Sequence, residues 1–462
     1  MLINGGIFTG SVTGGSNWVE VESTGGSVTV NGNIATASGS GFDSSVTIYT
    51  GLSGGSITTG SITTGNVTAY GGSTYVDIEA DQGVQVNGNI QTGNASNGNS
   101  GVSIAAATGA LVIGGSTTTG QASNKTVDYY GAAGVSTAGG IFTRSFAAGQ
   151  AGGDVGIITQ TGAISIGGDI DTRGANGAYG LEDGSRGGSV FMLRQQGDVV
   201  PSSGPAISVN GGITTSGGDG APASFKTGGK GGDAGHVFMG ALFCEACETP
   251  QTAGSILVSG PIIAKGANGG ASTNAAYGGG AGGYGGEVAL FAMDSVSVGP
   301  TPEAGVTKTA IDTSGGAGGA SPGQGGMGGS AGSVGIDPAA ITINGVVLAL
   351  GGDGGAGAVQ GAGGAGGFLD LFAPGGTVTF VNGGYDLTGG AGNGPGASGT
   401  ATIDGTLIFA FVTNSDVFGN PAVAQSIGST INDVLKSTSS PTDKESDEDK
   451  KKKKGGISSC KP

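Results

Sequence analysis

Residues that carry most enzyme and metal chemistry are scarce in this sequence. The 462 residues include one histidine, one tryptophan and three cysteines, and only 11% are charged. His236 is therefore the one candidate for a histidine-based triad, and we expect it to be a surface residue at the start of a strand. Three cysteines exclude a disulfide-rich scaffold. The sequence thus predicts a protein that is not an enzyme, with no catalytic residues, no cofactor and no metal site.

Positive charge is also scarce. The chain has 17 basic and 33 acidic residues, a net charge of −16. Phosphate binding needs a basic face, so this balance excludes nucleic acid as a partner and argues against anionic lipid. No stretch approaches the roughly 20 apolar residues of a membrane helix, so we expect no membrane span. The opening residues, MLINGGIFTG, lack the basic and apolar segments of a signal peptide.

Glycine, in contrast, is abundant, with 107 of 462 residues. No strict Gly-X-Y period is present, which excludes collagen. Hydrophobic residues make up 36%, and valine and isoleucine alternate with polar residues, unlike in disordered chains. Glycine inside a strand or helix costs about 0.5–1 kcal/mol relative to alanine. So many glycines must therefore lie at tight corners, bulges and points of close backbone approach.

One heptamer recurs along the chain. Its copies are VTVNGNI from Val28, VQVNGNI from Val84, ISIGGDI from Ile164, ISVNGGI from Ile207, ILVSGPI from Ile256 and ITINGVV from Ile341. In the first copy, Val28 and Val30 face one side of a strand, and Asn31-Gly32 bends the chain. Ile34 then turns inward on the next strand. The heptamer therefore predicts a corner between two strands that share one core.

A second module follows each glycine-rich stretch, as in SVFML from Ser189 and FLDLFA from Phe368, again with alternate apolar residues. The two modules recur every 40 to 50 residues or so, which is typical of a solenoid with insertions at its corners. We expect an all-β parallel β-helix over residues 1–416. At the ~4.8 Å spacing of strands, we expect about 16 coils.

The glycine-rich insertions lie mainly within 210–400. Examples are GGGAGGYGGE from Gly278 and GGDGGAGAVQGAGGAGG from Gly351, which have neither helical nor strand periodicity. Two interpretations remain open. The insertions are either flexible loops or extended, polyproline-II-like strands that lie beside one another, where only glycine permits backbone contact.

The C-terminal residues differ from the repeats. Asn420 is a helix-capping residue and Pro421 suits the first helical position, and an apolar face follows. We expect a short amphipathic helix over 420–440 that caps the open end of the solenoid. The remaining residues, 441–462, have an acidic cluster followed by lysines and predict a disordered charged tail.

Candidate site residues are few. Cys244 and Cys247 form a C-x-x-C motif, for which a local disulfide, free thiols and a metal site with His236 all remain open. Acidic residues such as Asp169 and Asp171 are scattered, and we expect them to be solvated surface charges. A polysaccharide-acting enzyme would need carboxylates gathered in a groove.

The alternation of G-x-V-x-L-x-A with I-x-V-x-G-x-I, separated by glycine-rich segments, resembles filamentous-haemagglutinin-type adhesins of Gram-negative bacteria. These proteins use two-partner secretion. The resemblance covers roughly Gly25 to Asp416, and the glycine-rich stretches also resemble mycobacterial glycine-repeat surface proteins. The haemagglutinin resemblance implies a right-handed β-helix that is exported through an outer-membrane partner. The family's N-terminal secretion domain is not visible, so we expect a C-terminal portion that lacks its signal peptide.

The leading functional hypothesis is a non-catalytic, secreted or cell-surface protein of the Gram-negative outer membrane. Like an adhesin, it would present a long polar repeat surface to glycans or proteins of cells or matrix. The alternative is a polysaccharide-acting β-helix lyase or hydrolase. A third hypothesis, an ice-binding solenoid, needs regular Thr-x-Thr ranks, for which only Ile57 to Thr64 gives a hint.

Overall fold

The computed structural model describes residues 1–51, 54–178, 183–195, 204–241 and 254–410. The chain divides into two units, Met1–Val412 and Thr413–Pro462. The described part is all-β and contains no helix. The predicted capping helix at 420–440, the charged tail at 441–462 and the three cysteines lie outside the described residues.

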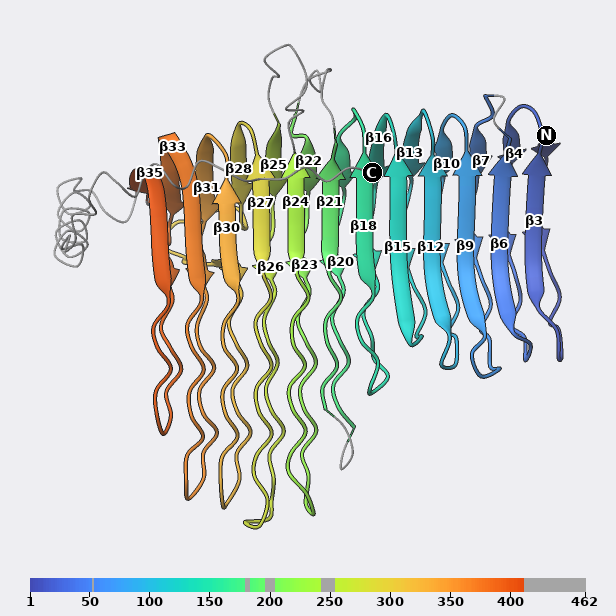
Figure 1. The fold of residues 1–462 in the computed structure, drawn as a ribbon. Helices are drawn as coiled ribbons and strands as arrows, with labels where there is room; N and C mark the ends of the chain where they lie inside the picture. The colour runs from blue at the N-terminus through green and yellow to red at the C-terminus, as the bar shows by residue number, and fades with distance from the viewer. Residues whose placement is uncertain (52–53, 179–182, 196–203, 242–253, 411–462) are drawn as a thin grey trace, which may run out of the picture. The chain divides into compact units, whose positions relative to one another are not determined.

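The strands form parallel ladders in which each strand pairs with the strand three places further along the chain (Figure 1). Three series result, and one strand from each makes a repeat. The first series is β3 (Asn17–Ser23), β6 (Asp43–Thr50), β9 (Ser73–Ala80), β12 (Asn99–Ala106), β15 (Asn124–Gly131), β18 (Asp154–Thr159), β21 (Val190–Arg194), β24 (Val237–Ala241), β27 (Val288–Ala292) and β30 (Ser333–Asp337).

The second series contains the strands of the recurring heptamer. It is β1 (Leu2–Ile3), β4 (Val28–Val30), β7 (Ile57–Thr59), β10 (Val84–Val86), β13 (Ala110–Ile113), β16 (Gly134–Thr137), β19 (Ile164–Ile166), β22 (Ile207–Val209), β25 (Ser255–Val258), β28 (Ser295–Val298) and β31 (Ala340–Asn344). Two long strands, β33 (Phe368–Val381) and β35 (Thr400–Ala410), continue the first and second series together.

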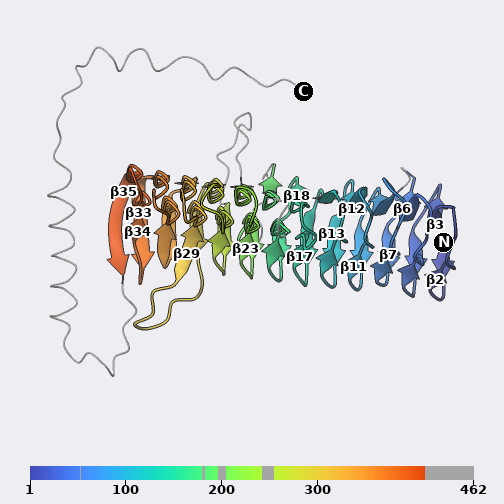
Figure 2. The same cartoon turned by 90° about the horizontal axis from the view of Figure 1, so that it is seen from below.

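The third series forms a separate 12-stranded sheet. It is β2 (Ile7–Phe8), β5 (Ile34–Ala35), β8 (Ile62–Thr63), β11 (Ile90–Gln91), β14 (Thr117–Thr118), β17 (Ile141–Phe142), β20 (Ile170–Asp171), β23 (Ile213–Thr214), β26 (Ile262–Ile263), β29 (Thr309–Asp312), β32 (Val346–Leu348) and β34 (Tyr385–Asp386). Seen from below, the repeats follow one another in a row from β2 to β35 (Figure 2).

The core runs along this row because like residues stack on like. Val28 pairs with Ile57, which pairs with Val84, which pairs with Leu111, and all four are at most 1% exposed. The predicted inward positions of the heptamer are thus confirmed. This order of parallel strands is consistent with the predicted solenoid. The expected 16 coils were too many, since the 12 strands of the third series show that the insertions consume much of the chain.

The insertions connect each third-series strand to the next first-series strand, and the longest of them is 264–287. We call 172–178, 183–189, 215–236, 264–287, 313–332, 349–367 and 387–399 the glycine-rich array. Figure 1 shows these segments side by side below the strands. Each insertion has an outgoing and a returning limb. In one outgoing limb, Gly316 N donates to Gly283 O and Gly318 N to Asp353 O, and Gly319 N donates to Gly280 O (2.9, 2.8 and 2.8 Å).

Gly316 and Gly319, three residues apart, therefore both donate to the insertion 264–287. Three residues is the period of a polyproline II helix. Glycine is required at these points because the limbs touch. A Cβ on Gly319 would lie 2.0 Å from Gly270 O, and one on Gly326 would lie 1.9 Å from Gly280 O. The structure therefore confirms the second interpretation, in which extended segments lie side by side.

Candidate binding groove beside the third strand series

A three-residue pattern follows the strands of the third series in the N-terminal half. It occurs as Thr64-Gly65-Asn66, Thr92-Gly93-Asn94 and Thr119-Gly120-Gln121. The threonines are buried, and the hydroxyls of Thr64 and Thr92 accept hydrogen bonds from the backbone N–H of the next repeat's glycine, both at 3.0 Å. The threonines therefore belong to the interior, and Gly93 and Gly120 are also buried, whereas Asn66 and Asn94 are exposed and Gln121 is half-buried.

The glycines leave a floor of bare backbone. A Cβ on Gly93 would lie 2.1 Å from Gly65 O, and one on Gly120 would lie 1.9 Å from Gly93 O. Successive repeats are thus too close for any side chain at these positions. Because no side chain covers these positions, a furrow runs along the row of repeats.

The amides form one wall of the furrow, and the stacking holds them in place. Asn66 N donates to Ser38 Oγ (3.0 Å), Asn94 N to Asn66 Oδ1 (2.8 Å) and Gln121 N to Asn94 Oδ1 (2.7 Å). Each carboxamide oxygen of Asn66 and Asn94 is therefore used by the repeat that follows. Among the described residues, the NH₂ groups of Asn66 and Asn94 have no partner and can donate to a ligand.

Together these residues line a cavity of about 850 Å³, which we call the groove. Thr63, Gln91 and Thr118, on the outer side of the third-series strands, form the opposite wall. The groove has no acidic residue in its lining, and its one charged side chain is Arg144.

Arg144 closes the glycine-floored part of the groove. It follows Thr143 in the chain, as Gly120 follows Thr119, so an arginine stands where the three preceding repeats have glycine. Arg173, after Thr172, takes the same place in the next repeat. The furrow of bare backbone therefore ends at two guanidinium groups.

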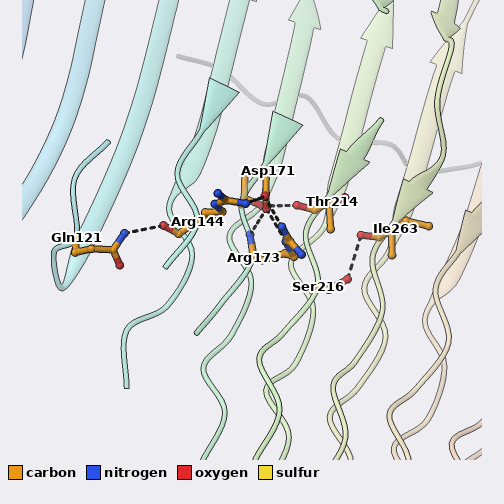
Figure 3. Close-up of polar contacts among 8 residues, drawn as sticks. Gln121, Arg144, Asp171, Arg173, Thr214, Ser216 and Ile263 are labelled. Atoms are coloured by element: carbon orange, nitrogen blue, oxygen red, sulfur yellow. Dashed lines mark hydrogen bonds and ion pairs between the residues drawn. The ribbon is translucent and has the colours of Figure 1, made fainter. Parts of the chain in front are cut away.

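The two arginines share one carboxylate (Figure 3). Arg173 Nε and Nη2 lie 2.9 and 2.7 Å from the oxygens of Asp171, and Arg144 Nη1 lies 3.2 Å from Asp171 Oδ2. Asp171 is 10% exposed at its side chain, against 41% for Arg144 and 48% for Arg173. Sequence reasoning expected Asp171 to be a solvated charge, and this was wrong because the two arginines cover it.

These charges set the protonation state of Asp171. Burial alone would raise its pKa, but hydrogen bonds from the Arg173 side chain and backbone, together with the charges of Arg173 and Arg144, hold the pKa of Asp171 below its ordinary value. Asp171 is therefore ionised at neutral pH and keeps both guanidinium groups in place.

An aromatic ring completes this end of the groove. The guanidinium carbon of Arg144 lies 4.5 Å from the centre of the Phe146 ring, within the range of a cation–π contact. Gln121 holds the segment, since its Oε1 accepts from Phe146 N (2.7 Å) and its Nε2 donates to Arg144 O (3.2 Å). Phe146 is nonetheless 67% exposed. Such a ring offers a flat apolar surface to a ligand.

A second cavity, of about 560 Å³, lies on the other side of Arg144 and Phe146. Its lining includes Arg173, Ser216 and the carboxylate-bearing Asp219. The second cavity thus contains a second arginine and a carboxylate, whereas the groove has Arg144 as its one charged residue.

Carboxylates also line a cavity of about 580 Å³ on the first strand series. Asp43 and Asp77 come from neighbouring repeats and share this cavity with Tyr75. Asp128 lies on β15 of the same series, where burial and the charge of Asp154 raise its pKa. The enzyme alternative requires carboxylates that face each other at close range. Asp77 is in register with Thr47, four residues along β6 from Asp43, so Asp43 and Asp77 share the cavity without forming a close pair.

The structure places the other predicted residues as follows. His236 is exposed and directly precedes β24, and its Nδ1 accepts a hydrogen bond from Glu287 N (3.0 Å). Among the residues that the structure describes, no three His, Cys, Asp or Glu side chains converge to hold a metal ion. Cys244 and Cys247 lie outside that part. Thr59 and Thr64, two of the threonines behind the ice-binding hypothesis, are buried, so they form no exposed rank.

Sequence reasoning missed Arg144 and Phe146. The available signal was the alignment of Thr64-Gly65, Thr92-Gly93 and Thr119-Gly120 with Thr143-Arg144, which shows the arginine at the glycine position. In the part of the chain that the structure describes, no helix is long and apolar enough to cross a membrane.

Comparison of the chain with protein-family models, with curated proteins and with solved structures finds no match.

Proposed function

We propose that the chain is a non-catalytic, exported surface protein that attaches to extended glycans through the groove. The observation that carries the proposal is the recurrence of one set of groups in successive repeats. A glycine floor, a wall amide and an outward strand residue return about every 4.8 Å, the spacing of paired strands.

A polymer of sugars suits this arrangement because it also repeats. Each sugar would meet the same donors, and many weak contacts would add up to a usable affinity. The amides of Asn66 and Asn94 are preorganised, which reduces the entropy lost on binding. Phe146 offers a ring for stacking at one end.

The finer features of the fold belong to the same proposal. We take the stacked repeats to be a closed, right-handed β-helix, since crossovers between parallel strands are right-handed in about 98% of cases. The resemblance to filamentous-haemagglutinin-type adhesins supports export through an outer-membrane partner and residence at the cell surface.

Obstruction of the groove tests the proposal. Gln91 lies in the groove wall, whereas Gln85 lies on β10 of the same repeat, on the second series and outside the groove. We expect the full-length chain to be retarded by immobilised polysaccharides in affinity electrophoresis. Gln91→Trp should weaken the retardation at least about tenfold, since it loses the contacts of the central repeat, and the matched control Gln85→Trp should not.

Retention of Q91W that equals or exceeds that of the unchanged chain contradicts the proposal. The alternative function, a polysaccharide-acting enzyme, would use the carboxylates of Asp43 and Asp77 that line one cavity. It predicts that the polymer is shortened on incubation and that Asp77→Asn prevents this. An attachment protein leaves the polymer length unchanged.

A further inference from the structure

We propose that the Arg144 end of the groove binds an anionic group, a carboxylate or a sulfate, that is carried by a linear polysaccharide. The inference rests on the proposed function and names the class of glycan. It draws on the charges, the free donors and the rigidity of this end of the groove.

The charge distribution is the first argument. The chain has a net charge of −16, yet the groove lining contains no acidic residue. Two guanidinium groups share the carboxylate of Asp171, and the other carboxylate near them, Asp219, lines the second cavity and not the groove. An otherwise acidic protein therefore presents one local site to which an anion is attracted.

The free donors are the second argument. Arg173 uses Nε and Nη2 on Asp171, but Arg144 uses only Nη1. Among the described residues, Nε and Nη2 of Arg144 have no partner, and 41% of the side chain is exposed. A guanidinium group with two free donors can accept the paired oxygens of a carboxylate or sulfate.

Rigidity is the third argument. Asp171 holds Arg144 on one side, and the ring of Phe146 lies against the guanidinium group on the other. Gln121 in turn holds the backbone of both Arg144 and Phe146. The guanidinium group is thus oriented before a ligand arrives, which lowers the cost of binding.

The two cavities beside Arg144 assign a direction to the ligand. In the cavity of about 560 Å³, the positive charge of Arg173 is opposed by the carboxylate of Asp219, whereas the groove of about 850 Å³ contains no carboxylate. We therefore place the anionic group on the groove side of Arg144, with the rest of the polymer along Gln121, Asn94 and Asn66.

The test compares three polymers on the full-length chain: polygalacturonate, which carries carboxylates, dextran sulfate, and neutral dextran. We expect at least one acidic polymer to bind more tightly than dextran and to weaken as salt is added. Arg144→Gln should reduce that affinity about 10- to 100-fold, the loss of a hydrogen-bonded charge pair. Arg186→Gln, a matched change at an exposed arginine outside both cavities, should leave affinity unchanged.

Arg144→Lys keeps the charge but loses the fork geometry, so we expect a loss of affinity smaller than that of R144Q. If circular dichroism shows that R144Q folds poorly, the affinity of R144K is the test. The polymer that responds to R144Q identifies the group as carboxylate or sulfate. If dextran binds as tightly as the acidic polymers, or if R144Q and R186Q weaken binding equally, the inference is overturned while the groove proposal stands. If none of the polymers binds, both are overturned.

Discussion

At the scale of single residues, the buried threonines after the third-series strands join the strand core to the glycine-rich array. The hydroxyl of Thr172 donates to Gly188 O (2.6 Å), and that of Thr215 donates to Gly235 O (3.0 Å). Thr313 occupies the same position, but its buried hydroxyl has no partner among the described residues. The same residue type therefore stabilises one repeat and leaves a desolvated hydroxyl in another.

Replacement of these two threonines by valine should have opposite effects. Thr215→Val leaves Gly235 O without its donor and should cost about 1 kcal/mol, whereas Thr313→Val removes an unpaired polar atom and should be neutral or stabilising. Thermal unfolding of both variants measures this difference. If T215V and T313V change the unfolding temperature equally, the hydrogen bond from Thr215 to Gly235 O does not distinguish the two repeats, and the prediction is wrong.

Lys125 is an unusual inward-facing residue of the first series. It is 3% exposed, and it stands in register with Ser100 and, one repeat earlier, Thr74. Its Nζ donates to Ala122 O (3.2 Å), Ala151 O (2.6 Å) and Ser145 Oγ. Burial lowers the pKa of Lys125 from 10.5 to about 8.

A lowered pKa makes stability depend on pH. Between about 8 and 10.5, the unfolded chain holds the lysine proton and the folded chain has released it, so the free energy of unfolding rises with pH in this window. Below pH 8 this dependence ends. From pH 8 to 9.5 the unchanged chain should gain about 2 kcal/mol relative to Lys125→Met. Urea unfolding of both proteins tests this, and parallel pH profiles would refute it.

At the scale of elements, the glycine-rich array forms a second structure beside the strands. An interior limb such as 315–321 contacts limbs of the repeats on both sides. Ala317 and Ala320, three residues apart on this limb, are more exposed than Gly316 and Gly319. One outward column also bonds through its side chains: Asp219 Oδ1 accepts from Asn268 N (2.9 Å), and Asn268 Oδ1 accepts from Ala317 N (3.0 Å). The array is therefore ordered by backbone contact and not by an apolar core.

A single methyl group at an inward glycine should disturb this packing. Gly319→Ala places a Cβ 2.0 Å from Gly270 O, and we expect a loss of about 1–3 kcal/mol, typical of overpacking. The adjacent, exposed Ala320→Ser should have no effect. Hydrogen exchange over the limb Gly315 to Ser321 measures the change. Unaltered protection in G319A would contradict the close packing of the limbs.

The strands of the second series could be predicted from sequence because their signal is local. Val28, Val30 and Ile34 reveal the inward face within seven residues. The glycine-rich array gave two interpretations, because each glycine is required by backbone from another repeat, as Gly319 is by Gly270. The groove end was missed for the same reason: Arg144 and Asp171 meet only after the repeats stack.

At the scale of the whole molecule, an acidic, repetitive chain contains an extended groove with a basic end. Stacking of repeats produces the bare floor, the fixed amides and the arginine end without any dedicated domain. Because the groove residues recur in successive repeats, we expect affinity to depend on ligand length, since each further sugar contacts the groove residues of one more repeat.

The most direct measurement is calorimetric titration of the full-length chain with oligosaccharides of increasing length, taken from whichever polymer it retains. We predict that affinity increases with each added sugar until the groove is filled, that it then levels off, and that the oligosaccharides are recovered at their original length. Affinity already maximal at a mono- or disaccharide, or recovery of shortened products, would contradict an extended, non-catalytic binding groove.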